Sequence, residues 1–217
     1  NVMSILIYAE SSEGKFKKAA FELASYGKKI AESTGTTLTA LTINAPDSSE
    51  LGKYGVDKVL QVSDSALNSF SAKAFADVIQ QAARQENAKI IIFSSSTDSL
   101  YAAPMVAVAL DAGYASNVVS LPESTAPFRV KRTAFSNKAF NLTEISSDVK
   151  VLSLAKNSYG LHETTGAAAA TAFAPSLSEA DFAVKVEATE KSSGKVTIAD
   201  AEVVVSGGRG LKGPENW

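Results

Sequence analysis

The sequence contains no cysteine and a single histidine, His162, among its 217 residues. The absence of thiols excludes disulfides, thiolate catalysis and iron–sulfur clusters ligated by cysteine. With one imidazole, a transition-metal site would have to rest on carboxylates, and a Ser-His-Asp triad could use only His162. His162 lies in a stretch rich in Ala, Thr and Ser, so the sequence predicts a solvated surface histidine.

The sequence also lacks an excess of charge and a long apolar run. The formal net charge is -2, so no broad field attracts nucleic acid or anionic lipid. The longest apolar runs, such as Ile90–Phe93, are too short to cross a bilayer. No signal or transit peptide is recognisable at the start. We therefore expect a cytoplasmic protein that binds no nucleic acid and does not insert into a membrane.

The first 121 residues alternate between apolar runs and amphipathic stretches. Strands are predicted at 3–10, 37–45, 56–62, 89–93 and 116–121. One helix is indicated by Phe16, Ala20, Leu23, Gly27 and Ile30 on one face, ending near Gly35. A second is indicated by Phe75, Val78, Ile79 and Ala82, and a third covers 100–113. This order predicts an α/β fold with a parallel, doubly wound, Rossmann-like sheet (adenine-nucleotide-hydrolase-like).

The connections shorten after Pro127. Strands at 127–135, 139–146 and 149–157 are separated by two or three residues, which predicts an antiparallel extension to about residue 156. Residues 162–181 read as a connecting arm. Further strands are expected at 182–190 and 201–206. We predict an N-terminal domain over 3–181, then a linker and the first strand of a second domain over 182–217.

Two polar clusters are weaker candidates for binding. Residues Ser94–Ser99 follow a central strand, where α/β sheets bind ligands, but Ser and Asp at a helix start more often cap its N–H groups. We favour the cap. Arg129, Lys131, Arg132 and Lys138 gather in the antiparallel region; a solvated sheet face is the default, and contact with an acidic partner is the alternative.

The stretch VVVSGGRGLKGPENW at 203–217 carries the clearest motif. Residues 208–213 match G-x-G-x-x-G after an apolar run. Glycines allow a phosphate to approach the backbone, but the motif alone is equally compatible with a tight turn. Pro214 and Glu215 stand where a P-loop needs Lys and Ser or Thr, which excludes a Walker-type site.

Four stretches precede SGGRGL in a fixed order: SILIYAESSEGKFKKAAFELASYGKKIA, GVDKVLQVSD, SSSTDSLYAAPMVAVALDAGYASNVVSL and FRVKRTAFSNKAFNLTEI. In these stretches and in SGGRGL, the chain resembles the alpha subunit of electron transfer flavoproteins, in the family's order. The resemblance covers the chain from about Met3. It implies an N-terminal assembly scaffold followed by the start of an FAD domain.

The same resemblance implies the functional residues and partners. Arg209 corresponds to the family's arginine beside FAD, and Gly207, Gly208 and Gly210 shape its loop. The implied partners are a beta subunit, acyl-CoA or other dehydrogenases as donors, as in fatty acid oxidation, and a quinone oxidoreductase or similar acceptor. The protein is then an electron carrier rather than an enzyme. Because the family's later flavin-binding segments have no match before residue 217, these residues alone are not expected to hold FAD.

Two other functions remain open from the residues. One is a stand-alone α/β domain that binds an adenine nucleotide near Ser94–Ser99. The other is an interaction domain without a cofactor. Binding of ATP or AMP by the chain alone would distinguish the first from the electron carrier.

Overall fold

The computed structural model describes residues 4–184, 186–188, 198, 201 and 203–216. They fall into two compact units that divide between Val186 and Glu187. The first unit holds every strand that the structure describes. The domain boundary predicted at residue 181 stays a prediction.

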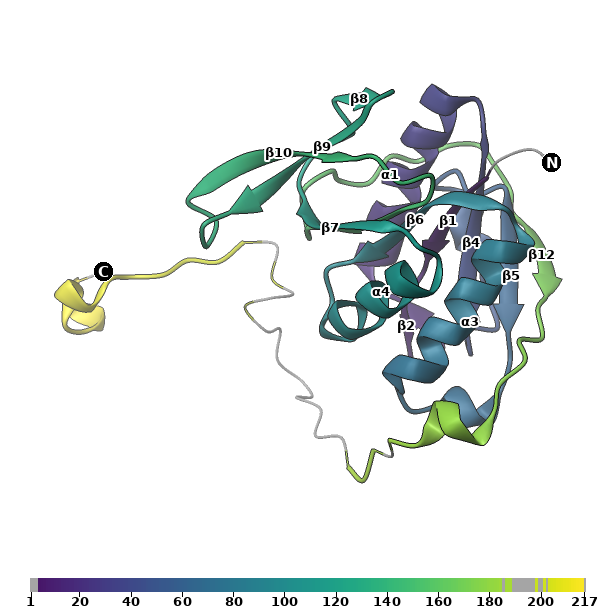
Figure 1. Cartoon of the computed structure of the whole chain (residues 1–217). Coiled ribbons are helices and arrows are strands. Elements are labelled where there is room, and N and C mark those ends of the chain that lie inside the picture. The colour runs from purple at the N-terminus through teal and green to yellow at the C-terminus, as the bar shows by residue number, and fades with distance from the viewer. Residues whose placement is uncertain (1–3, 185, 189–197, 199–200, 202, 217) are drawn as a thin grey trace. The chain divides into compact units, whose positions relative to one another are not determined.

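A mostly parallel sheet forms the centre of the first unit (Figure 1). Its strand order is β10-β9-β7-β11-β6-β1-β4-β5-β12, and the run from β7 to β12 is parallel throughout. The expected α/β fold with a parallel, Rossmann-like sheet is therefore confirmed. The parallel strands are β1 (Ser4–Tyr8), β4 (Thr37–Ile43), β5 (Lys58–Val62), β6 (Ala88–Ser94), β7 (Gly113–Val118), β11 (Lys150–Leu154) and β12 (Ala169–Ala172).

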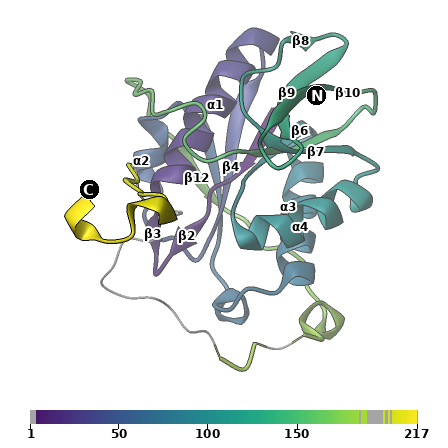
Figure 2. The same ribbon diagram turned by 90° about the vertical axis from the view of Figure 1, so that its left-hand side faces the viewer.

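Helices cover both faces of this sheet (Figure 2). On one face lies α1 (Lys18–Thr34), which ends at Gly35 in a left-handed conformation with φ 63°, as the sequence predicts. On the other face lie α3 (Ala72–Gln85) and α4 (Thr97–Ala109). The short α2 (Ser49–Gly52) precedes β5. Because the central strands are buried on both sides, they read as continuous apolar runs.

The segment before α1 is not helical. Residues 11–16 form a small hairpin of β2 (Ser11–Ser12) and β3 (Lys15–Phe16). Phe16 still packs against the core beneath α1, which is why it fits the helical pattern of apolar residues.

The antiparallel extension is shorter than expected. Strands β9 (Phe128–Ala134) and β10 (Ala139–Ile145) form the predicted hairpin, and β8 (Ser124–Thr125) pairs with β9. The prediction that 149–157 continues it is wrong, because β11 lies between β7 and β6 and is parallel to both. The short link does not make β10 and β11 a hairpin, because they are not neighbours in the sheet.

The link between β10 and β11 crosses the start of β7 at Gly113. The Gly113 amide donates to Ser147 Oγ at 2.7 Å and to the Val149 carbonyl at 3.3 Å. A Cβ at this position would lie 2.5 Å from Cγ2 of Ile145 and 2.9 Å from Ser147 Oγ. A side chain here would have to displace Ile145 and Ser147, so glycine suits the crossing that inserts a late strand into the middle of the sheet.

Residues 155–182 form a strap around the first unit rather than a loose connecting arm. The strap passes α1 and α2, adds β12 to the edge of the sheet beside β5, and ends in a short 3-10 turn at Glu179–Phe182. Phe173, Leu177 and Phe182 pack against the core on the α3 side. The predicted arm is thus part of the fold.

The two strands expected near the C-terminus are not seen where the chain is described. Residues 203–206 have no strand pairing, and neither do 183–184 and 186–188; residues 185, 189–190 and 202 lie outside the described part. A strand is stabilised by pairing with a neighbour, and an apolar run alone does not supply one. Val203 and Val205 are about 80% exposed.

Candidate functional site

The carboxyl ends of β1 and β6 form the point where ligands bind in open α/β sheets. From β1 the chain proceeds to β4 on one side, whereas β6 lies on the other side of β1. Glu10 follows β1, and Ser94, Ser95 and Ser96 lead from β6 into α4. This switch in strand order places the N-terminus of α4 beside the end of β1.

The Glu10 carboxylate occupies this position. Its Oε1 atom accepts hydrogen bonds from the hydroxyls of Ser94 at 2.8 Å, Ser96 at 2.6 Å and Ser99 at 2.5 Å. Ser96 also caps α4, because its Oγ accepts the Ser99 N–H at 3.0 Å. The cap is therefore confirmed for Ser94–Ser99, and the serine hydroxyls bind a carboxylate of the chain itself.

The Glu10 carboxylate contributes to raising the pKa of two neighbouring groups. Partial burial and then the Glu10 carboxylate raise the pKa of Asp98, while Lys17 opposes the shift. Burial raises the pKa of the Tyr8 phenol well above its usual value, with smaller contributions from Glu10 and Asp98. Further negative charge at this edge is therefore unfavourable.

A pocket of about 550 Å³ lies at the carboxyl ends of β4 and β5. Asn44, which lines it, donates to the Asp64 carbonyl at 2.8 Å and to Asn68 Oδ1 at 2.9 Å, and accepts the Asp64 N–H at 2.9 Å. The Gln61 amide is bonded to Ser48 Oγ at 2.8 Å. These polar groups join two loops to each other, which is a structural role.

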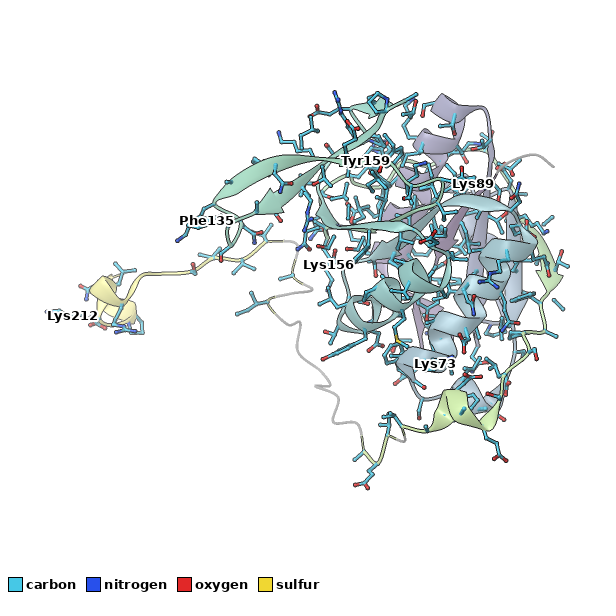
Figure 3. All side chains as sticks on the ribbon, viewed as in Figure 1. Lys73, Lys89, Phe135, Lys156, Tyr159 and Lys212 are labelled. Atoms are coloured by element: carbon cyan, nitrogen blue, oxygen red, sulfur yellow. The ribbon has the colours of Figure 1, made fainter. Side chains whose placement is uncertain are left out.

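The basic cluster lies on the projecting hairpin of β9 and β10 (Figure 1). Arg129 pairs with Glu144 across the hairpin at 2.8 Å, and Arg132 donates to Ser116 Oγ on β7 at 2.8 Å. Lys131 lies 4.6 Å over the Phe140 ring. Phe135, 79% exposed, marks the hairpin tip, where Lys138 approaches its ring (Figure 3). The cluster is thus engaged within the hairpin and, through Arg132, with β7.

Histidine and carboxylates form no metal site in the part of the chain that the structure describes. His162 is exposed on the strap, where its ring lies 4.8 Å from that of Tyr159. None of the helices described is long and apolar enough to span a bilayer.

The loop with Arg209 belongs to the second unit. Gly208 precedes a 3-10 turn at Arg209–Leu211, and residues 207–210 are exposed. A Cβ on Gly208 or Gly210 would meet nothing within 4 Å. Nothing in the described chain therefore requires glycine there, and the open backbone leaves room for another group.

Several polar anchors of the fold were missed by sequence reasoning. The buried Glu22 carboxylate of α1 accepts the N–H groups of Asn157, Tyr159 and Gly160 at 2.8–2.9 Å and holds the loop after β11. The only sequence signal is a carboxylate at an otherwise apolar helix position.

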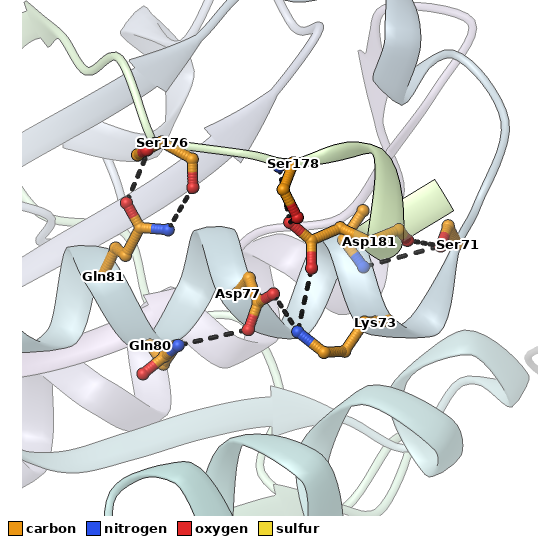
Figure 4. A network of polar contacts seen from close by, with 9 residues as sticks. Ser71, Lys73, Asp77, Gln80, Gln81, Ser176, Ser178 and Asp181 are labelled. Carbon is orange, nitrogen blue, oxygen red and sulfur yellow. Dashed lines mark hydrogen bonds and ion pairs between the residues drawn. The ribbon is translucent and has the colours of Figure 1, made fainter. Parts of the chain in front are cut away.

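A second anchor fixes the end of the strap (Figure 4). The Asp181 carboxylate accepts the Ser178 N–H at 2.7 Å and a bond from Lys73 at 2.9 Å, and Lys73 also pairs with Asp77. Ser71 Oγ donates to the Asp181 carbonyl at 2.8 Å. The Ser178 amide and then Lys73 hold the pKa of Asp181 well below its usual range. We call this the Asp181 clasp.

The sequence profile described as "Electron transfer flavoprotein domain" matches residues 5–180, most of the chain. The chain belongs to the electron transfer flavoprotein family. It is 25% identical over 210 residues to "Electron transfer flavoprotein subunit alpha" of Syntrophomonas wolfei and 24% identical over 216 residues to the protein of that name in Bacillus subtilis, covering 96% and 98% of this chain. It is 28% identical over 120 residues, 54% of this chain and 33% of the relative, to "Acryloyl-CoA reductase electron transfer subunit beta" of Anaerotignum propionicum.

The chain covers 66% of the length of each of the two subunit alpha relatives, slightly less than two thirds. The family match over residues 5–180 covers all but the first residue of the sheet, the hairpin, and the strap up to the residue before Asp181. The loop with Arg209 lies outside the matched residues.

Proposed function

We propose that this chain is the alpha subunit of a heterodimeric electron transfer flavoprotein and carries electrons through FAD rather than turning over a substrate of its own. The match to the electron transfer flavoprotein domain over 5–180 is the observation that supports this function. The relatives named subunit alpha, aligned over nearly the whole chain, support the choice of subunit.

In this proposal the first unit is a scaffold. The edge of the sheet where a nucleotide would bind holds Glu10, bound by Ser94, Ser96 and Ser99. A phosphate placed there would meet a carboxylate instead of unoccupied donors. The alternative, a stand-alone adenine-nucleotide domain, is therefore less well supported than a scaffold.

Arg209 is proposed to contact the FAD. Bound FAD supplies the capacity to accept and release electrons. Arg209 carries a permanent positive charge and several donors, and Gly208 and Gly210 leave the backbone around it open. Gly207 is proposed to extend this open loop. A guanidinium here suits an anionic group of the cofactor and favours negative charge developing nearby.

The remaining partners follow from the same proposal. A beta subunit completes the flavoprotein. The donors are proposed to be acyl-CoA or other dehydrogenases, as in fatty acid oxidation, and the acceptor a quinone oxidoreductase or a protein of similar role. The proposed location is the cytoplasm.

The test uses the full-length subunit assembled with its beta subunit. Arg209→Ala should weaken FAD binding about ten- to a hundredfold, since a charge-assisted hydrogen bond contributes roughly 1.5–3 kcal/mol. Arg209→Lys should recover only part of the affinity, because lysine lacks the planar fork of donors. FAD titration into the apoprotein measures both, and Lys212→Ala is the nearby cationic control.

Equal affinity and flavin potential in wild type and Arg209→Ala would remove Arg209 from the site. An assembled wild-type protein that takes up no flavin would instead contradict the proposed function itself.

A further inference from the structure

The pocket at the carboxyl ends of β4 and β5 has the size and the position of a small-molecule site. Its volume is about 550 Å³, and ligand sites usually measure about 300–1,000 Å³. The carboxyl ends of parallel strands are where α/β proteins bind ligands. The pocket lies beside a different pair of strands from β1 and β6, whose edge Glu10 occupies. We call this cavity the β4–β5 pocket.

The chain itself holds the wall of the β4–β5 pocket in place. Asn44, which lines it, has a left-handed backbone with φ 51°, a conformation that asparagine tolerates. Its side-chain carbonyl accepts the Asp64 N–H at 2.9 Å, and its amide donates to the Asp64 carbonyl at 2.8 Å and to Asn68 Oδ1 at 2.9 Å. These bonds join the loops that follow β4 and β5. A ligand therefore meets a preformed wall, and less free energy is lost in ordering it.

Two acceptor oxygens of this wall are left over when the loops are joined. Asp64 Oδ1 accepts the Ala66 N–H at 2.9 Å, whereas Asp64 Oδ2 has no hydrogen-bond partner among the described residues. Gln61 Nε2 donates to Ser48 Oγ at 2.8 Å and faces the Pro46 carbonyl at 3.5 Å. Gln61 Oε1 is likewise without a partner in the described chain. Both residues line the pocket and are partly buried, so a ligand with N–H donors suits it.

The charge around the β4–β5 pocket is negative. Among the described residues that line it, Asp64 is the only one that ionises near neutral pH. Asp47 follows the lining residue Pro46, and hydrogen bonds from Ser49 lower the pKa of Asp47. Lys53 adds a smaller lowering of that pKa but does not line the pocket. A phosphate or a second carboxylate would therefore meet like charge here, whereas a cation is attracted.

The lining residues favour an organic cation over a metal ion. Ca²⁺ and Mg²⁺ take about six or more oxygen ligands, and the described residues contain no group of three or more His, Cys, Asp or Glu side chains that could hold a metal ion. The pocket also has an apolar part at Pro46 and Val62. We propose that the β4–β5 pocket binds a small organic cation, whose ammonium or amidinium group donates to Asp64 Oδ2 and whose carbon part lies against Pro46 and Val62. This site does not depend on the proposed electron transfer.

The test compares three probes of one shape and different charge on the full-length chain: benzylammonium, benzyl alcohol and benzoate. Amide signals in the NMR spectrum of the ¹⁵N-labelled protein report both the location and the strength of binding. Benzylammonium should shift the signals of the residues that line the pocket, with a dissociation constant on the order of 10 mM. Benzyl alcohol should bind about fivefold more weakly, which is the difference between a hydrogen bond to a charged donor and one to a neutral donor. Benzoate should not saturate these signals.

Two matched variants assign the effect to one carboxylate. Asp64→Asn keeps an oxygen that accepts the Ala66 N–H but removes the charge, so it should weaken benzylammonium about fivefold and leave benzyl alcohol unchanged. Asp47→Asn removes a carboxylate that does not line the pocket and should weaken benzylammonium less than twofold at physiological salt. An unchanged spectrum of Asp64→Asn without probe, outside the residues next to position 64, shows that the fold is retained.

The other results overturn the proposal. Equal binding of the three probes, or tightest binding of benzoate, removes the preference for a cation. Benzylammonium that binds Asp64→Asn as tightly as wild type removes Asp64 from the site. Signals that shift only outside the lining residues, or that do not shift with any probe at 50 mM (about five times the expected dissociation constant), show that the β4–β5 pocket is not the site.

Discussion

Replacing Gly52 with alanine should destabilise the protein although the residue is helical. Alanine at a helix position normally stabilises by about 0.5–1 kcal/mol relative to glycine. Here a Cβ would lie 2.8 Å from the C and Cα atoms of Ala167 and closer still to the Ala168 amide nitrogen. The strap cannot easily retreat, because Thr164 Oγ1 donates to the Gly52 carbonyl at 3.3 Å and the Ala169 N–H donates to the Asp57 carbonyl at 3.0 Å.

Overpacking of this kind costs about 1–3 kcal/mol. We expect Gly52→Ala to lower the free energy of unfolding by that amount and to speed amide exchange across β12, because the strap must move away from α2. Urea unfolding and hydrogen exchange measure the two effects. Gly35→Ala is the control: its φ of 63° strains alanine, but nothing lies within 4 Å, so stability should fall by about 1–2 kcal/mol without faster exchange in β12.

A Gly52→Ala protein with raised stability and unchanged exchange in β12 would refute the reasoning. The helix preference would then outweigh the contact, and the strap would have more freedom than the structure gives it.

Two further predictions concern the carboxylates of Glu10 and Asp181. Glu10→Ala should lower the free energy of unfolding by roughly 1–3 kcal/mol, since three hydroxyls lose a charged acceptor, and Glu10→Gln by less; equal stability of all three proteins in calorimetry would contradict this. Because the pKa of Asp181 is lowered well below its usual range in the folded state, the Asp181 clasp stabilises fully above the ordinary aspartate pKa of about 4 and is lost progressively as pH falls from there through the lowered folded-state pKa. Asp181→Asn should thus reduce the urea midpoint most at pH 6 and by a smaller amount at pH 3, and an equal or larger reduction at pH 3 would count against the clasp.

The local elements of the fold could be read from the sequence because their signals are local. Gly35 ends α1 where predicted, and Phe75, Val78, Ile79 and Ala82 form the buried face of α3. The N-cap at the start of α4 follows from a serine placed before an apolar run.

The long-range pairings could not be read in this way. β11 and β10 are close in sequence and share a short link, yet β11 pairs with β6, which lies more than fifty residues earlier. The run of alanines in β12 carries no strand signal, because its pairing with β5 is set by the strap. Glu10 meets serines that lie more than eighty residues away.

At residues 203–206 the sequence predicts a strand that the structure does not show. Val203, Val204 and Val205 have strong strand preferences, but preference without a neighbouring strand forms no sheet in the described residues. For the proposed FAD contact, the sequence supplied the motif around Arg209, whereas the occupancy of the β1–β6 edge by Glu10 needed coordinates.

The late insertion of β11 has a consequence for synthesis on the ribosome. When residue 118 has emerged, β6 and β7 exist as sequence but lack the strand that lies between them. The sheet remains divided until residue 154 is available. Before then, β7, β9 and β10 on one side of β11 cannot join β6, β1, β4 and β5 on the other side in one hydrogen-bonded sheet. A nascent chain paused in this interval exposes two apolar strand edges of the kind that templates aggregation. The timing of chain emergence between residues 118 and 154 is therefore a vulnerable step in the production of this protein.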